Sequence, residues 1–187
     1  SPLYYPNYGS PSSISWSNRN VSGDGWVLVQ GGCSNYSSPS YVTVANKKNF
    51  IVSGCNSGYT YSSVFFPIRQ GQNLSYNTSN TTSTESYYLQ NKSSSKVTAP
   101  DWQKAALRQW QTSYNAPCDG WLYAECGSGG SQGYITISST NITICQQNNG
   151  CQSYSSAFVP ISSGDQFTLY HQGYPGPCFF IPGLKES

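Results

Sequence analysis

The stretch Asp24-Gly-Trp-Val-Leu-Val29 returns in the second half of the chain as Asp119-Gly-Trp-Leu-Tyr-Ala124. Each copy joins an Asp-Gly turn to a run of apolar and aromatic residues, which is typical of a turn followed by a β-strand. Further matches follow in the same register on both sides: Asn7-Tyr8 with Asp101-Trp102, Trp16 with Trp110, Tyr41-Val-Thr-Val44 with Tyr134-Ile-Thr-Ile137, and Phe66-Pro-Ile68 with Val159-Pro-Ile161. The chain therefore contains two copies of one module.

The matched residues are mostly apolar or turn-forming, so the duplicated unit is a fold and not a single catalytic centre. We expect an N-terminal arm (residues 1–5), a first module (6–89), a linker (90–99) and a second module (100–187). The linker contains Lys92-Ser-Ser-Ser-Lys96, whose composition predicts a flexible hinge. Each module is small for a domain, so it must close a small core or share surface with its twin or another subunit.

Strand signals recur about every ten residues with turn clusters between them, and helix signals are nearly absent. This pattern predicts an all-β protein of two tandem β-sandwich modules of a jelly-roll-like type. Residues 102–110 include good helix formers, but the matching segment of the first module contains Pro11 and several serines, so we expect both to be irregular or strand-like. Pro67 and Pro160 cannot donate to a ladder, so their strands should lie at an edge or bend there.

The charge content is low: 9% of residues are charged and the formal net charge is +2. Such a weak field does not indicate a nucleic-acid partner. No run of about 18 apolar residues is present, so we expect no segment that spans a bilayer by itself. The chain has no Met and begins at Ser1, and we expect a processed N-terminus.

Seven cysteines without a metal-like C-x-x-C pair indicate an oxidising compartment and disulfide bonds. An odd count leaves at least one thiol free or paired between chains. Positions within the repeat predict two bonds, Cys33 with Cys55 and Cys126 with either Cys145 or Cys151. A further pair, Cys118 with Cys178, would tie the start of the second module to its final strand.

Seven Asn-x-Ser/Thr sequons are candidate glycosylation sites: Asn20, Asn35, Asn73, Asn77, Asn80, Asn91 and Asn141. Together with the cysteines they favour a secreted glycoprotein. The alternative is a virion or cytosolic β-protein in which these asparagines are only turn and surface residues.

Candidate catalytic chemistry is sparse. His171 is the only histidine, and we expect a structural role for it and no metal site or cofactor. Asp24 and Asp119 precede glycine, which predicts carboxylates bonded to nearby backbone N–H groups and a glycine with positive φ. Glu125 and Asp165 could supply the two acids of a glycosidase, but the first module has Gln72 at the place of Asp165. We therefore expect no catalytic residue and a protein that is not an enzyme.

The order of turns and core residues resembles the β-modules of phage tail-fibre and prophage minor structural proteins. The second module carries the resemblance throughout: Pro100-Asp-Trp102, Ala116-Pro-Cys-Asp-Gly-Trp121, Tyr134-Ile-Thr-Ile137, Val159-Pro-Ile161, Gly164-Asp165 and Phe180-Ile-Pro182. The first module is a partial match. The resemblance implies compact β-sandwich domains on the outer parts of virions, used for structure or attachment. The cysteines and sequons depart from it and favour a eukaryotic virus or a cell-surface filament.

These features predict a structural subunit of an extracellular or virion-surface fibre or filament whose partners are copies of itself. The arm residues Leu3, Tyr4 and Tyr5 are candidates for adding a strand to a neighbouring subunit in head-to-tail assembly. The alternative is a carbohydrate-binding adhesin or viral attachment module, in which aromatic and amide side chains of loops 36–41 and 127–133 bind cell-surface glycans. Tyrosine, with 16 copies, suits both roles.

Overall fold

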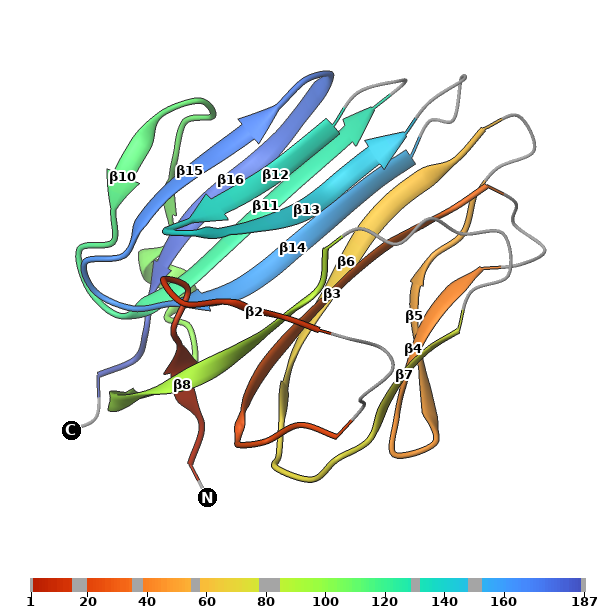
Figure 1. Ribbon diagram of the computed structural model, residues 1–187. Coiled ribbons are helices and arrows are strands. Elements are labelled where there is room, and N and C mark those ends of the chain that lie inside the picture. Colours follow the sequence, from red (N-terminus) through yellow and green to blue (C-terminus); the bar gives the residue numbers. More distant parts are fainter. Residues whose placement is uncertain are drawn as a thin grey trace.

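The computed structural model shows an all-β protein whose strands form two modules side by side, each built from two facing sheets (Figure 1). The structure describes residues 2–14, 20–34, 39–54, 58–77, 85–128, 132–147 and 153–185. Within these ranges the helical element is a single 3-10 turn, η1 (Trp102–Lys104). The predicted all-β sandwich fold is confirmed.

The first module packs a larger sheet against a smaller one. The larger sheet runs in the order β1 (Tyr4–Pro6), β8 (Tyr87–Lys96), β3 (Gly25–Cys33) and β6 (Thr60–Ile68), and β2 (Ser12–Ser13) also pairs with β8. The smaller sheet runs in the order β5 (Lys47–Val52), β4 (Ser40–Val44) and β7 (Leu74–Asn77). Buried aliphatic side chains fill the space between them: Val27, Val29, Val42, Ile51, Ile68 and Leu74.

The second module repeats this arrangement. One sheet runs in the order β14 (Ser153–Ile161), β11 (Gly120–Ser128), β16 (Tyr174–Pro182) and β9 (Ala106–Leu107). The facing strands run in the order β13 (Thr140–Gln147), β12 (Gln132–Ile137), β15 (Gln166–His171) and β10 (Ser113–Asn115). β14 is an edge strand, as Pro160 predicts.

Equivalent strands keep the same face toward the core. Val27 and Val29 of β3 lie in the first core, and Leu122 and Ala124 of β11 lie in the second. Because side chains alternate along a strand, the residues between them point to the opposite side of the sheet. The two modules therefore present equivalent outer faces.

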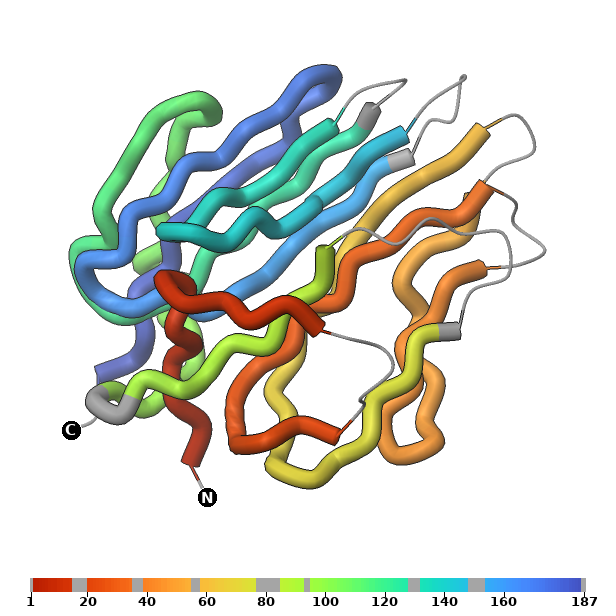
Figure 2. The backbone as a smooth tube through the Cα atoms, viewed as in Figure 1, coloured from red at the N-terminus to blue at the C-terminus, as the bar shows by residue number. Residues whose placement is uncertain are grey.

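The modules are packed together as one unit. β6 pairs with β13 over Tyr61↔Gln146 and Thr60↔Gln147, which joins their sheets. The hydrophobic core of the second module also crosses the boundary between the modules, because it includes Leu28 of the first module. In Figure 2 the first module's β6 runs beside the second module's β13 and β14.

The structure differs from the expected linker, residues 90–99, because residues 90–96 belong to β8. Lys96 pairs with Tyr4 in the ladder between β8 and β1. Lys92 Nζ donates to Ser162 Oγ at 2.7 Å and to Asp165 Oδ1 at 3.1 Å. The segment expected to be a hinge is thus a paired strand that is bonded to the second module.

The N-terminal arm folds onto its own subunit. Tyr4 and Pro6 pair with β8, Tyr5 is buried, and Leu3 remains exposed. The Trp26 indole Nε1 donates to the Tyr4 carbonyl oxygen at 2.8 Å. Strand exchange through this arm would require these contacts to break.

The two Asp-Gly turns are equivalent, but their bonds are not the local ones that we predicted. Asp24 Oδ1 accepts the Gln70 N–H at 2.9 Å, and Asp119 Oδ1 accepts the Ser163 N–H at 2.8 Å. The Asp24 carboxylate therefore links the start of β3 to the turn after β6. The Asp119 carboxylate links the start of β11 to the turn after β14 in the same way.

Gly25 and Gly120, the glycines of the two Asp-Gly turns, do not have the positive φ that we predicted for them. Positive φ occurs at Gly71 (81°) and Gly164 (84°), in the turns that the carboxylates fasten. At Gly25 and Gly120 an added Cβ would lie 2.3 Å from a backbone carbonyl oxygen of the adjacent strand. Glycine is needed there for close strand approach.

Candidate interaction face

A stack of three aromatic rings lies on the outer face of the second module. The rings of Trp102 and Phe158 have centroids 5.4 Å apart and planes 14° apart, and those of Phe158 and Trp121 are 4.7 Å and 9° apart. Trp102 is 56% exposed and Phe158 is 38% exposed. Trp121 is held in place because its Nε1 donates to the Thr98 carbonyl oxygen at 2.8 Å. Large stacked rings are therefore open to solvent.

The apolar surface continues across the sheet. Tyr123 of β11 pairs with Phe158 of β14 on one side and Phe179 of β16 on the other, and Phe179 pairs with Leu107 of β9. Leu107 is 70% exposed. We define the aromatic face by these residues: Trp102, Leu107, Trp121, Tyr123, Glu125, Phe158 and Phe179.

Glu125 is the acidic member of this face. Tyr123 Oη donates to its carboxylate at 3.0 Å. Burial raises the pKa of Tyr123, and the hydrogen bond to Glu125 raises it further. The tyrosine hydroxyl stays protonated and fixes the carboxylate at the surface.

The first module contains the same three-ring stack with its two outer rings, Tyr8 and Trp26, buried and Phe65 half-buried. Tyr8 stacks on Phe65 at 6.0 Å, Phe65 stacks on Trp26 at 5.2 Å, and Trp26 makes the equivalent indole bond to Tyr4. Tyr8 is 0% exposed and Trp26 is 4% exposed. Tyr8 Oη donates to the Pro160 carbonyl oxygen of the second module at 2.5 Å. The second module covers the Tyr8 ring, whereas the Trp102 ring of its own stack is uncovered.

The hairpin of β12 and β13 forms part of that cover. Gln30, at the place equivalent to Glu125, donates to the Asn141 carbonyl oxygen at 3.1 Å and accepts the Thr143 N–H at 2.7 Å. Thr140 Oγ1 donates to the Tyr8 carbonyl oxygen at 2.8 Å. The outer face of the first module thus satisfies backbone groups on the edge of β13.

The two acids considered as a catalytic pair, Glu125 and Asp165, do not lie together in one site. Asp165 lies in the turn after β14, at the Gly120 end of β11, and is bonded to Lys92 and Ser162. Glu125 lies farther along β11, opposite Ser156, so the two acids do not face each other across one cleft. Among the described residues no group of three or more His, Cys, Asp or Glu side chains could hold a metal ion.

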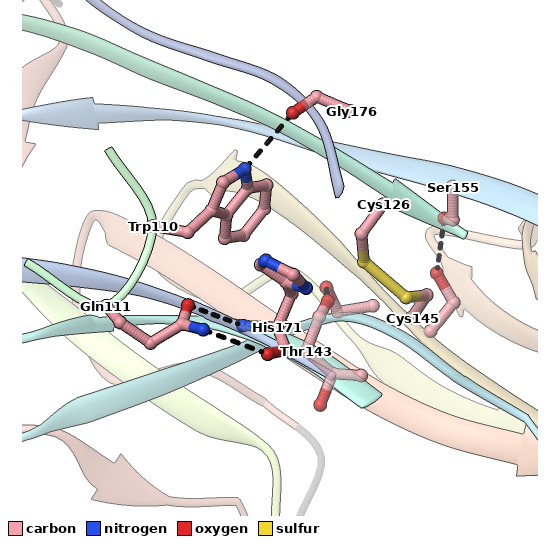
Figure 3. The surroundings of a disulfide bond; sticks show 10 residues. Trp110, Gln111, Cys126, Thr143, Cys145, Ser155, His171 and Gly176 are labelled. Carbon is pink, nitrogen blue, oxygen red and sulfur yellow. Dashed lines mark hydrogen bonds between the residues drawn. A yellow bond between two sulfur atoms is a disulfide. The ribbon is translucent and has the colours of Figure 1, made fainter. Parts of the chain in front are cut away.

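His171 packs as a structural residue at the edge of the second module (Figure 3). Its ring meets the Trp110 ring edge-on at 5.0 Å, and the Trp110 indole donates to the Gly176 carbonyl oxygen at 3.1 Å. His171 Nδ1 is buried without a hydrogen-bond partner among the described residues. Burial lowers the pKa of His171.

A disulfide joins Cys126 to Cys145, one of the two partners predicted for Cys126 (Figure 3). It connects β11 to β13 and so links the two sheets of the second module. Cys33 is buried at the end of β3. The predicted bond from Cys33 to Cys55 is not described, because Cys55 and Cys151 lie outside the residues that the structure describes.

The predicted bond between Cys118 and Cys178 is wrong, because both are free thiols. Cys178 pairs with Ala124 in the ladder between β11 and β16, whereas Cys118 precedes Gly120 at the start of β11. Their positions along the ladder keep them apart. Cys178 Sγ instead donates to the Arg108 carbonyl oxygen at 2.9 Å.

The sequons differ in accessibility. Asn20, Asn73 and Asn141 are exposed, and Asn73 Nδ2 donates to Asn20 Oδ1 at 3.3 Å. Asn91 in β8 is half-buried. The remaining sequon asparagines, or their side chains, lie outside the described part of the chain: Asn35, Asn77 and Asn80. Glycosylation remains a prediction at all seven.

Sequence reasoning did not identify the aromatic face. Its signal is present in the repeat, because Tyr8 matches Trp102 and Trp26 matches Trp121. The structure adds Phe65 and Phe158, at equivalent places opposite Leu28 and Tyr123. Aromatic residues that repeat at positions pointing away from the module's own core could have marked this surface.

Comparisons with known proteins give little guidance. No protein-family model and no curated protein matches the chain. One solved structure, described as the atomic structure of Sulfolobus Turreted Icosahedral Virus, has a chain that is 13% identical. The match covers 98% of this chain and 93% of that chain with a TM-score of 0.26, which is too low to support a common fold. In the described residues no helix is long and apolar enough to cross a membrane.

Proposed function

We propose that the protein is a non-enzymatic structural subunit of an extracellular or virion-surface fibre, and that its aromatic face mediates self-association. The observation that carries this proposal is the pair of equivalent ring stacks. In one stack Tyr8 lies between the modules at 0% exposure and Phe65 is half-buried, and in the other Trp102 is open at 56%. A surface whose twin is an internal interface is suited to the same use between subunits.

Physical chemistry favours association at this face. Burying apolar surface contributes about 25 cal/mol per Å², and stacked aromatic pairs add about 0.5–1.5 kcal/mol. The sheet already holds the rings in one arrangement, so little side-chain entropy is lost on binding. The face can therefore bind without rearrangement of the module.

Other features support an extracellular or virion-surface location. The Cys126–Cys145 disulfide fits an oxidising compartment. Three sequon asparagines are exposed: Asn20 and Asn73 of the first module and Asn141 of the β12–β13 hairpin.

The test is assembly of the purified native protein, followed by electron microscopy and sedimentation velocity. We expect ordered polymers, and we expect Trp102→Ala to raise the concentration needed for assembly at least about tenfold, the equivalent of 1.4 kcal/mol. Leu3→Ala, which shortens an exposed apolar side chain of the first module outside the aromatic face, is the control. A native protein that stays monomeric at all concentrations contradicts the proposal.

A second candidate function is carbohydrate binding at the same surface, as in an adhesin. It is favoured by the exposed rings beside the Glu125 carboxylate and by a groove of about 350 Å³ lined by Phe65, Ser156 and Phe158. Aromatic faces with nearby polar groups suit sugar rings. Monomers that bind glycans on an array, and lose binding with Trp102→Ala, would favour this function over assembly.

A further inference from the structure

The aromatic face has a matching surface on the same chain, the hairpin of β4 and β5. In the second module the equivalent hairpin, β12 and β13, lies against the outer face of the first module. β5 is the edge strand of its sheet, and among the described residues no strand pairs with its outer side. Residues 45–50 are all exposed, and Phe50 is 54% exposed. In Figure 2 this hairpin (orange) lies at the right-hand margin of the first module.

The register of the two hairpins identifies equivalent residues. Thr43 pairs with Lys48 in the first hairpin, and Thr136 pairs with Asn141 in the second. Lys48 therefore takes the place of Asn141. Two residues farther along, Phe50 takes the place of Thr143.

We infer that the β4–β5 hairpin of one copy of this chain docks on the aromatic face of a second copy, as the β12–β13 hairpin docks on the first module. This inference rests on the proposed function and names the partner surface. Its occupant is a second copy because the chain itself shows how such a face and such a hairpin fit together. The junction between copies repeats the junction between modules.

The differences between the two junctions are complementary in charge. Within the chain, the neutral Gln30 amide meets the backbone of Asn141 and Thr143. Between copies, Glu125 takes the place of Gln30 and meets the strand that carries Lys48. Like the Gln30 side-chain oxygen, a Glu125 carboxylate oxygen can accept a hydrogen bond from a backbone N–H. Glu125 has no N–H to donate, but its negative charge attracts the Lys48 ammonium group.

The junction joins two different surfaces, so it is heterologous. Each copy in the assembly offers one face and one hairpin. Such contacts produce rings when the rotation closes and helical filaments when it does not. The inference therefore predicts a polymer with a direction, in which every junction is the same.

The experiment uses two variants that each block one surface. Trp102→Asp blocks the face and Phe50→Asp blocks the hairpin; both side chains are more than half exposed, so both variants should fold, as circular dichroism will check. We expect each variant alone to sediment as a monomer. An equimolar mixture should form one-to-one pairs and no longer species, because only one intact face and one intact hairpin remain.

A charge exchange provides an independent readout. Glu125→Lys and Lys48→Glu should each reduce assembly at least about tenfold, and the two changes in one chain should restore it. Lys185→Glu, outside both surfaces, is the charge control. Polymers that form normally with Phe50→Asp but not with Trp102→Asp overturn this inference and leave the proposed function standing. Blocked variants that do not pair when mixed also overturn it, whereas a native protein that never assembles overturns the proposed function.

Discussion

Single residues show how the two modules diverged from one pattern. Tyr8 and Trp102 occupy equivalent places, yet Tyr8 is buried with its hydroxyl bonded to Pro160 and Trp102 is open. Gln30 and Glu125 also occupy equivalent places. The neutral amide of Gln30 lies in the junction between the modules, whereas the carboxylate of Glu125 lies on the surface. A buried, unpaired charge would cost several kcal/mol, so the amide suits the closed junction. The sequence shows these pairs but does not show which member is covered.

His171 gives a pH-dependent prediction at this scale. Burial lowers its pKa below the ordinary value of 6.5, so the unfolded chain binds the proton more readily than the native protein does. Stability is therefore fully present above pH 6.5 and falls as the pH drops from there through the native pKa. Urea unfolding of the monomer between pH 7.5 and about 5 measures this fall.

The control for His171 is the His171→Gln variant, which keeps a polar side chain and does not titrate. We expect its stability to change less over the same pH range. An equal decline in both proteins would assign the effect to other titratable groups and not to the imidazole. His171 would then have no role in the pH response.

Among the strands, β8 explains why part of the fold was not predicted. Its serine-rich second half has the composition of a linker, but its backbone pairs with β1 and its Lys92 reaches the second module. These partners are distant in sequence and local composition does not reveal them. The Asp-Gly-Trp strands β3 and β11 were predictable because turn chemistry and apolar alternation agree there.

Strand β1 gives a prediction at the same scale. Deleting residues 1–5 removes the buried Tyr5 side chain and the carbonyl group that accepts the Trp26 indole bond. We expect monomer stability to fall by about 3 kcal/mol or more, the usual effect of removing a large buried ring. Urea unfolding measures the loss, and deleting Ser1 and Pro2 alone is the control.

The result also separates two roles of the arm. If its role is the one seen within the subunit, deletion lowers stability and the remaining polymers keep their junctions. If the arm exchanges between subunits as the sequence suggested, deletion leaves monomer stability unchanged and stops assembly. Sedimentation velocity on the same deletion variant distinguishes these outcomes.

For the molecule as a whole, the shared core predicts cooperative unfolding. Leu28 and Leu89 of the first module lie in the same buried cluster as Leu122 and Ile144 of the second. We therefore expect one unfolding transition in urea, followed equally by tryptophan fluorescence and far-ultraviolet circular dichroism. Two modules joined by a flexible linker would instead unfold in separate steps.

Lys92→Ala tests the same point, because it removes the ammonium group that bonds Ser162 and Asp165 across the module boundary. Hydrogen bonds to charged groups contribute about 1.5–3 kcal/mol, and partial exposure of Lys92 lowers the expected loss to about 1–2 kcal/mol. The transition should move to lower urea and stay single. Lys185→Ala, at an exposed position, is the control, and a split transition with Lys92→Ala would contradict the shared core.

The buried ring stack of the first module has a consequence for how such a chain arose. A single-module ancestor with one aromatic face and one hairpin of this kind would already have been a self-associating protein. Duplication and fusion placed two such units in one polypeptide, where the second unit meets the first at an effective concentration on the order of millimolar. In the polymer that we propose, every other junction is then made when the chain folds, before any subunit meets another.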